Sequence, residues 1–239
     1  MRRSLMVLLG AAACTPVVAV AALFGAAHFA WMDRMSLAMP TAIRVPIAQI
    51  AMSSAGYGKD SAKKIDRVIR IDPESPDGWA RRCDYSQNPD ARDNPAVSLQ
   101  TCRKALALHR SEDNFNGIGM AQEELKDYCT AEESFTRANS MVNARDSYVL
   151  RNMGRAALEC GNAPWSVANF EVAEEVDAKN TEDEEDKDDL KLDREWLIVA
   201  YTANHDPQAV KVACGKVHPD WKRCACVADG YSVRCNNAQ

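Results

Sequence analysis

The sequence has 239 residues, of which 46% are hydrophobic and 26% are charged, a composition typical of a globular protein with a sizeable core. Its 29 Lys and Arg residues against 34 Asp and Glu residues give a formal net charge of −5. Residues 1–44 contain four arginines and one aspartate, so they carry +3 and the rest of the chain carries −8. This acidic remainder argues against nucleic acid as a partner, because binding phosphates requires clustered Lys and Arg.

The N-terminal part contains an uninterrupted apolar segment. Leu5–Trp31 holds no Asp, Glu, Lys or Arg and exceeds the roughly 20 residues that cross a bilayer as a helix. This length favours an uncleaved signal anchor over residues 1–31, since a cleaved signal peptide has an apolar region of about 7–15 residues. Cleavage or lipidation at Cys14 is the alternative. The two arginines after Met1 favour a cytoplasmic N-terminus, and residues 32–43 follow as a linker.

From residue 44 onward, helical periodicity alternates with turn signals. Pro46–Ser54 is apolar at helical spacing. Ser61–Ile71 follows, with its apolar residues on one side, and stops at Asp72-Pro73 because proline cannot continue a helix. A second pair of helices opens at Pro76 and continues, after a long loop, over Val97–Leu108.

One pattern occurs twice between Glu112 and Asn180. Gly119 and Gly154 lie 35 residues apart, and so do Phe135 and Phe170. The same spacing separates Ala138 from Ala173. Small residues that recur at fixed offsets beside large apolar ones indicate two closely packed helices stacked on the next pair.

A run of seven carboxylates in nine residues follows at Thr181–Asp189. It contains no glycine, whereas a calcium loop needs one at its centre. We therefore expect a solvated linker and the acidic start of the next helix. A weaker copy of the repeat spans Leu190–His218.

These spacings resemble the tetratricopeptide repeat (TPR), whose period is about 34 residues. The resemblance covers most of residues 44–219 and is strongest in the middle. It implies an all-α fold, a TPR-like α-solenoid of about five helix pairs. The pairs would occupy residues 44–75, 76–110, 112–146, 147–180 and 190–219.

The resemblance also implies a function. TPR proteins hold peptides or partner proteins in a groove lined by the first helix of each pair. Carried onto this chain, the pattern places these side chains in the groove: Arg81, Asp84, Asn116, Met120, Arg151, Asn152 and Arg155. Some relatives clamp a C-terminal carboxylate there, and the Arg and Asn donors suit such a ligand. The alternative is that the arginines only form a solubilising face.

We therefore expect a membrane-anchored scaffold, in a bacterial inner membrane with its repeats in the periplasm. It would bind a protein or peptide partner and assist the assembly of an envelope complex. No motif indicates an enzyme or a cofactor: Gly117-x-Gly119 lacks the strand and the third glycine of a dinucleotide loop. The histidines form no H-E-x-x-H pair, and no G-x-S-x-G elbow is present.

Eight cysteines lie beyond the apolar segment: Cys83, Cys102, Cys129, Cys160, Cys214, Cys224, Cys226 and Cys235. An even number behind a secretory-type leader indicates disulfides. The alternative is a metal- or redox-active carrier that uses the C-terminal cysteines with His218.

The repeat resemblance implies two bonds, Cys83 to Cys102 and Cys129 to Cys160. In the tail at residues 220–239, the Asp229-Gly230 turn predicts a hairpin that sets Cys224 opposite Cys235 and leaves Cys214 for Cys226. Two other pairings of these last four cysteines remain open.

Overall fold

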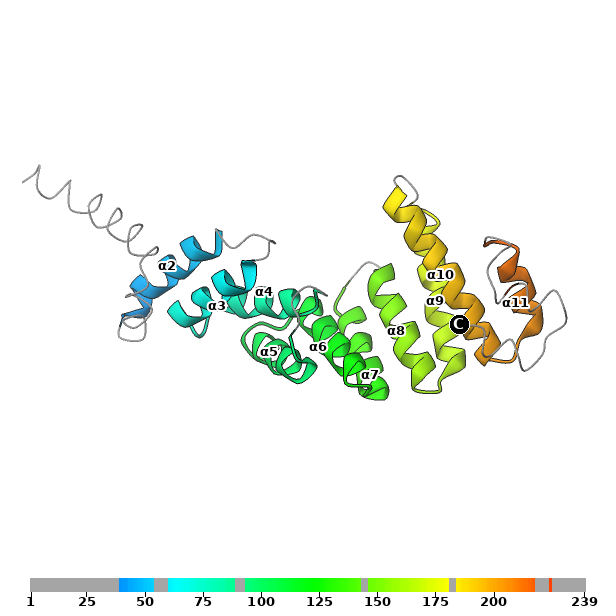
Figure 1. The fold of residues 1–239 in the computed structure, drawn as a ribbon, viewed down its shortest axis with the longest axis horizontal. Coiled ribbons are helices and arrows are strands. Elements are labelled where there is room, and N and C mark those ends of the chain that lie inside the picture. The colour runs from blue at the N-terminus through cyan, green and yellow to red at the C-terminus, as the bar shows by residue number, and fades with distance from the viewer. Residues whose placement is uncertain are drawn as a thin grey trace, which may run out of the picture. The chain divides into compact units, whose positions relative to one another are not determined.

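The computed structural model describes residues 39–53, 60–88, 93–142, 146–180 and 184–217, and Cys224. Over these residues the chain forms ten helices, α2 to α11, and no strand, which confirms the all-α prediction (Figure 1). None of the helices in these ranges is long and apolar enough to cross a bilayer. The predicted anchor and the predicted tail hairpin lie outside the described residues. The chain divides into two compact units, residues 1–92 with 107–109 and residues 93–106 with 110–239.

The first unit contains α2 (Thr41–Ser53), α3 (Ser61–Ile71) and α4 (Pro76–Ser86). α2 begins inside the segment predicted as a linker. Ser75 ends the turn before α4, and its hydroxyl accepts a hydrogen bond from the Gly78 amide at 3.1 Å. This cap and the proline in the first turn define the start of α4.

α2 and α3 share a small apolar core. It is formed by Ile47, Ala48 and Ala51 from α2 and by Val68 and Ile71 from α3. These residues recur at three- and four-residue intervals, as expected of helices that bury one face.

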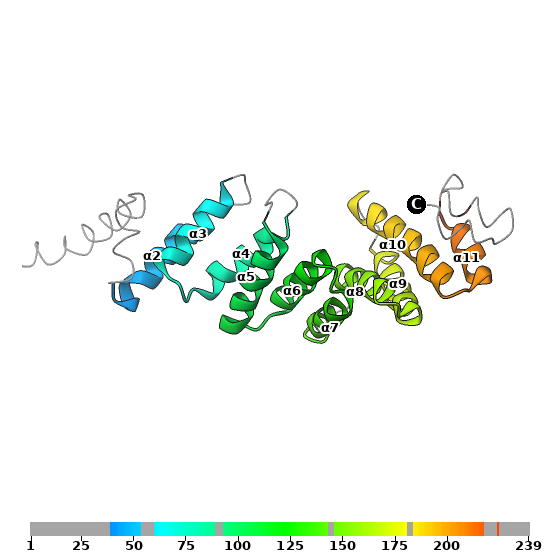
Figure 2. The same cartoon turned by 60° about the horizontal axis from the view of Figure 1, so that its bottom comes forward.

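The second unit contains α5 (Pro95–Leu108) as far as residue 106, α6 (Glu112–Glu124), α7 (Tyr128–Asn139), α8 (Ser147–Glu159), α9 (Ala163–Asp177), α10 (Glu184–Ala203) and α11 (Pro207–Cys214). From α6 onward, each helix packs against the next one along the chain (Figure 2). Since the helices follow one another after short turns, consecutive helices form antiparallel pairs.

The repeated glycines lie at helix contacts. A side chain added at Gly119 would place its Cβ 2.6 Å from the Phe135 ring, and one added at Gly154 would lie 2.8 Å from the Phe170 ring. Both phenylalanines are fully buried. The 35-residue recurrence is therefore the same contact, a glycine of the first helix against a phenylalanine of the second, made in two successive pairs.

The turn inside each of the last three pairs also repeats. Lys126, Gly161 and His205 each have a positive φ, of 63°, 87° and 56°. In each case the next residue's amide bonds to a carbonyl five residues earlier, for example Asp127 to Gln122 at 2.9 Å. This is the Schellman motif, which favours glycine at the left-handed position, yet only Gly161 of these three is a glycine.

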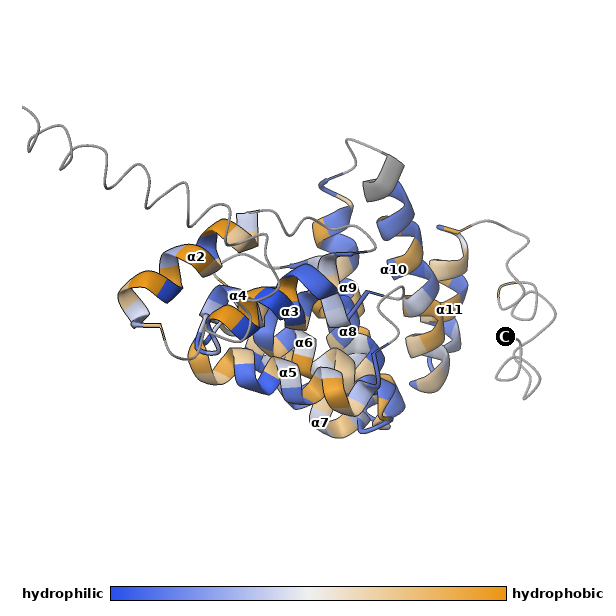
Figure 3. Cartoon of the chain, turned by 60° about the vertical axis from the view of Figure 1, so that its left-hand side comes forward, coloured by the Kyte–Doolittle hydropathy of each residue, from blue (hydrophilic) through white to orange (hydrophobic). Residues whose placement is uncertain are grey.

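α10 begins earlier than predicted. It starts at Glu184 rather than at Leu190, so the acidic helix start that the sequence predicted takes up most of the acidic run. The N-terminal turns of α10 project past the ends of the neighbouring helices (Figure 1). The residues of these turns that Figure 3 colours by hydropathy are hydrophilic. Carboxylates suit these positions because the N-terminus of a helix carries a partial positive charge.

The bonds Cys129–Cys160 and Cys214–Cys224 join described residues of the second unit. Cys129 is joined to Cys160 with a Cα separation of 5.0 Å, the pairing that the repeat register implies. Cys214 is joined to Cys224, so the predicted bonds from Cys214 to Cys226 and from Cys224 to Cys235 are wrong.

The physical reason for the correct tail pairing is burial. Cys224 lies in an apolar cluster with Ile198, Val210 and Ala213, next to the end of α11. The predicted pairing rested on the tail turn alone, which lies outside the described residues, as do Cys226 and Cys235. Cys83 and Cys102 are each disulfide-bonded and buried. Their pairing with each other stays a prediction.

Candidate functional site

In the second unit, the first helices of the last three pairs are α6, α8 and α10, and together they present one row of mostly polar and aromatic side chains. α8 contacts both α6 and α10. We call this row the first-helix surface, and it consists of Asn116, Met120, Glu123, Tyr148, Asn152, Arg155, Asp189 and Trp196. The sequence predicted four of these residues to line the groove, namely Asn116, Met120, Asn152 and Arg155.

Hydrogen bonds connect the α6 and α8 parts of this surface. The Asn152 amide donates to the Asn116 carbonyl oxygen at 3.2 Å. The Tyr148 hydroxyl donates to the Met120 sulfur at 3.3 Å. Asn152 is buried and therefore positions Asn116, whereas Tyr148 is 46% exposed. Tyr148 is thus an accessible aromatic side chain on this surface.

Arg155 connects all three helices. Its Nη2 atom donates to Glu123 on α6 at 2.6 Å, and its guanidinium lies 5.8 Å from the centre of the Trp196 ring on α10. Burial raises the pKa of Glu123, although Arg155 lowers it in part. Trp196 in turn stacks on the buried Phe170 ring, with centroids 5.8 Å apart. Arg155 is therefore held in place before any ligand binds.

Arg151 does not have the predicted role. Its side chain is 7% exposed, and it forms three ion pairs, with Asp177 at 2.9 Å, Asp189 at 3.0 Å and Asp193 at 2.7 Å. The assignment of Arg151 as an accessible carboxylate donor is wrong, because these three aspartates already occupy its donors. The aspartates lie 26 to 42 residues after Arg151 in the sequence, so no local pattern predicts these ion pairs.

The Arg151 cluster has unusual electrostatics. Burial raises the pKa of Asp193 to about 7; a hydrogen bond with Asp177 adds to this rise, and Arg151 opposes it. Within the described part of the chain, the second carboxylate oxygen of Asp193 is buried and has no hydrogen-bond partner. Burial alone would lower the pKa of Arg151, but its bonds to Asp193 and Asp189 raise it. The cluster joins α8, α9 and α10 and places three carboxylates around one guanidinium.

The remaining predicted groove residues lie elsewhere. Arg81 and Asp84 are on α4, in the first unit, where Asp84 is exposed and Arg81 is partly buried. The repeat pattern did not predict that Glu123, Tyr148, Asp189 or Trp196 would belong to this surface. Tyr148 had a usable signal, since it lies one turn before Arg151 on the same face of a helix.

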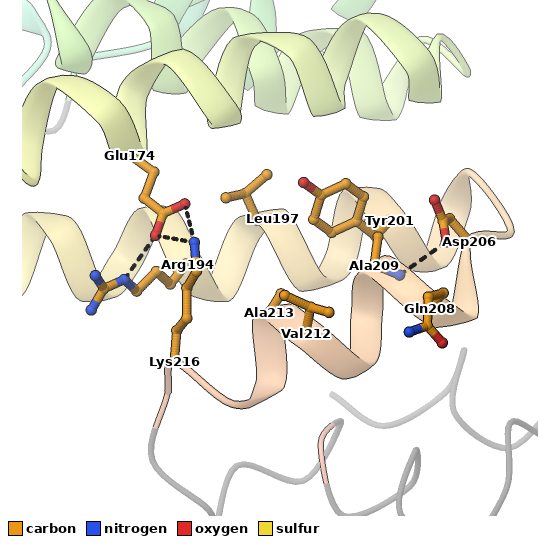
Figure 4. A pocket seen from close by; sticks show the side chains of 10 residues that line it. All are labelled: Glu174, Arg194, Leu197, Tyr201, Asp206, Gln208, Ala209, Val212, Ala213 and Lys216. Carbon is orange, nitrogen blue, oxygen red and sulfur yellow. Dashed lines mark hydrogen bonds and ion pairs between the residues drawn. The ribbon is translucent and has the colours of Figure 1, made fainter.

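A separate pocket of about 340 Å³ lies between α9, α10 and α11 (Figure 4). Its apolar wall includes Leu197, Ala213 and Val212, of which Val212 is 59% exposed. At one end Glu174 accepts from Arg194 at 3.0 Å and from Lys216 at 2.9 Å.

Charges within this pocket are largely balanced. Burial raises the pKa of Glu174, but Lys216 and Arg194 outweigh burial and lower it below its usual value. The Tyr201 hydroxyl donates to Glu171 at 2.7 Å, and burial together with Glu171 raises its pKa. The charged groups of this pocket pair with one another, whereas the first-helix surface presents the exposed ring of Tyr148, and we therefore take that surface as the candidate site.

The structure gives no support to the metal-carrier alternative. Within the described ranges, His, Cys, Asp and Glu form no group of three or more placed to hold a metal ion. Cys224, one of the four proposed ligands, is already bonded to Cys214. The other three, His218, Cys226 and Cys235, lie outside the described residues.

Comparison with known proteins supports the fold. The sequence matches no family model and no curated protein. Among solved structures, the chain is similar to the MamA protein, with a TM-score of 0.55, 15% identity, and coverage of 81% of this chain and 96% of that one. It is also similar to YrrB, described as a TPR protein with an unusual peptide-binding site, with a TM-score of 0.58, 12% identity, and coverage of 85% and 94%.

A third similar structure is the C-terminal part of a TPR repeat-containing protein from Cytophaga hutchinsonii. It has a TM-score of 0.52 and 18% identity, with coverage of 84% of this chain and 73% of that one. Identities this low establish the fold alone. The chain has the fold of TPR proteins.

Proposed function

We propose that this protein is a scaffold that binds a protein or peptide partner on its first-helix surface and has no enzymatic activity. The observation that carries the proposal is the row of polar and aromatic side chains, most of them at least partly exposed, that α6, α8 and α10 contribute to one face. Tyr148 offers an exposed aromatic ring, and aromatic and Arg side chains dominate the energy of protein interfaces. YrrB, a structural neighbour, is itself described as having a peptide-binding site.

We further propose that the scaffold is anchored in a bacterial inner membrane with its helices in the periplasm, where it assists the assembly of an envelope complex. The apolar segment Leu5–Trp31 supports the anchor. The bonds Cys129–Cys160 and Cys214–Cys224 support an oxidising compartment, since disulfides are rare in the cytosol.

Capture of a partner from native membranes tests the binding function. The tagged full chain is crosslinked in membranes and purified, and the proteins retained are quantified for the wild type and for Tyr148→Ser. Trp165→Ser on α9 is the matched control, because Trp165 is a similarly exposed aromatic, at 41%, on a second helix. We expect Tyr148→Ser to lose a partner that Trp165→Ser retains. Equal retention by both variants would refute the assignment of this surface.

A fusion of alkaline phosphatase to the C-terminus tests the topology, since this enzyme is active only outside the cytoplasm. We expect an active fusion. An inactive fusion, together with an active cytoplasmic reporter at the same position, would reverse the proposed orientation.

A further inference from the structure

The Arg151 cluster contains a buried acceptor that lacks a donor. The side chain of Asp193 is 0% exposed, and its Oδ1 atom accepts from Arg151 at 2.7 Å. In the described part of the chain, its Oδ2 atom is buried and has no hydrogen-bond partner. A buried polar atom without a partner destabilises the folded state, and a buried charge does so more strongly. An ionised Asp193 is therefore a poor fit to its surroundings.

A proton on Asp193 resolves this conflict. Asp177, whose side chain is 9% exposed, accepts from Arg151 at 2.9 Å and lies within hydrogen-bonding reach of Asp193. Two ionised carboxylates have no hydrogen to share, whereas a protonated Asp193 can donate from Oδ2 to Asp177. The pair then carries one negative charge beside the positive charge of Arg151. Asp177 and Asp193 are thus arranged to hold one proton between them.

The charged groups around Asp193 do not replace this proton. α8 contributes Arg151 and α9 contributes Asp177. On α10 itself, Asp189 lies one turn earlier, is 46% exposed and also pairs with Arg151. α11 packs on α10 further along the helix, and its one charged residue, Lys211, is exposed. Ionisation of Asp193 therefore adds a third carboxylate that Arg151 must offset.

The next turn of the same helix contact belongs to the first-helix surface. On α8, Arg155 follows Arg151 by four residues, and on α10, Trp196 follows Asp193 by three, so each pair lies on one helix face. Arg155 lies 5.8 Å from the centre of the Trp196 ring and donates to Glu123 on α6 at 2.6 Å. The Arg151–Asp193 ion pair and the Arg155–Trp196 contact are thus successive layers between α8 and α10. A displacement of α10 at the first layer reaches the second.

We propose that the first-helix surface is proton-linked: one proton held between Asp177 and Asp193 keeps α10 against α8, and its loss shifts Trp196 relative to Arg155. The proton leaves Asp193 Oδ2 for the solvent, and the ionised carboxylate stays beside Asp177 with one guanidinium for both. Burial sets the direction, because it favours the uncharged carboxyl in the folded chain. The consequence rests on the proposed function: a partner on this surface would bind more tightly at acidic than at alkaline pH.

The indole N–H signals in NMR spectra of the full chain, labelled with ¹⁵N-tryptophan in mild detergent, test the proposal without a partner. Trp196→Phe and Trp165→Phe identify the two signals that are compared. We expect the Trp196 signal to shift with a midpoint near about 7, the value to which burial raises the pKa of Asp193. The Trp165 signal, from α9, should stay unchanged. Since histidines also ionise in this range, a variant must assign the titration.

Two variants make the same charge change within the cluster. Asp193→Asn keeps an oxygen that accepts from Arg151 and gains an amide that donates to Asp177, so it mimics the protonated carboxyl. We expect its Trp196 signal to keep the acidic position of the wild type at every pH. Asp189→Asn, at the exposed member of the cluster, should retain the shift.

Three results would overturn the proposal: a Trp196 signal that does not move in the wild type, a titration that survives Asp193→Asn, or a shift that is lost in both variants. Because the titration is read without a partner, each of these results would leave the proposed binding function standing.

Discussion

Gly154→Ala tests the helix contact that defines the repeat. In the structure a Cβ at this position lies 2.8, 2.8 and 2.9 Å from three carbons of the Phe170 ring. Carbon atoms pack best at about 3.5–4.0 Å, so the ring or the helix must move by roughly 0.6–1 Å. The ring cannot easily move, because it is fully buried and stacked on Trp196.

The expected magnitude follows from two opposing effects. Overpacking a core typically costs about 1–3 kcal/mol, whereas replacing glycine by alanine within a helix contributes about 1 kcal/mol of stability. We therefore expect Gly154→Ala to lower the free energy of unfolding by up to about 2 kcal/mol. In a Phe170→Leu background the ring is absent, and the same substitution should raise stability by up to about 1 kcal/mol.

Urea denaturation of the purified full chain in mild detergent, followed by circular dichroism, measures both effects. Gly161→Ala is the control, since nothing lies within 4 Å of its added Cβ and its cost comes from the positive φ of 87°. That cost should be the same with Phe170 or Leu at position 170, because distant, independent effects add. A Gly154→Ala variant that is more stable than the wild type by about 1 kcal/mol would refute the contact.

Four further outcomes follow from the structure. The pKa of Asp193 is raised to about 7, so the protonated carboxyl stabilises the folded chain at low pH. This stabilisation should be lost as the pH rises from about 4 through 7, because the buried carboxyl then ionises. Urea denaturation at several pH values should show this loss for the wild type and not for Asp193→Asn. Arg151→Leu should cost about 3–5 kcal/mol, since it leaves buried carboxylates unpaired, and an unchanged melting temperature would contradict the buried cluster. Replacing both Cys129 and Cys160 by Ser should cost about 2–4 kcal/mol in the same assay, and no cost would mean that the bond is absent from the protein. Lys126→Gly should stabilise by up to about 1 kcal/mol, because glycine adopts positive φ without strain, and a loss of stability would contradict the turn.

The repeat could be predicted from the sequence, because it appears as a regular spacing of residues that lie close together along the chain. Gly119 and Phe135 recur as Gly154 and Phe170, and a glycine at a fixed distance before a phenylalanine encodes a helix contact directly. The pairing of Cys129 with Cys160 followed from the same register. The helix pairs were predictable because each depends on residues close together along the chain.

The candidate site was harder to predict, because it depends on residues far apart in the sequence. Arg151 appeared as a free donor since Asp177, Asp189 and Asp193 gave no sign that they would surround it. The acidic run was expected to form a linker and the acidic start of the next helix. Most of it belongs to α10, and its last member, Asp189, is a partly exposed part of the surface. The role of Arg151 depends on its burial among the three aspartates, and the type of a residue alone does not predict whether its side chain is buried.

Photocrosslinking from position 148 shows whether a partner lies against the first-helix surface. A photoreactive amino acid replaces Tyr148 in the full chain, or replaces Trp165 on α9 as the matched control, and native membranes are irradiated. We expect a crosslinked protein partner from position 148 whose yield far exceeds that from position 165. A partner captured equally from both positions, or from position 165 alone, would contradict the assignment of the first-helix surface as the binding site.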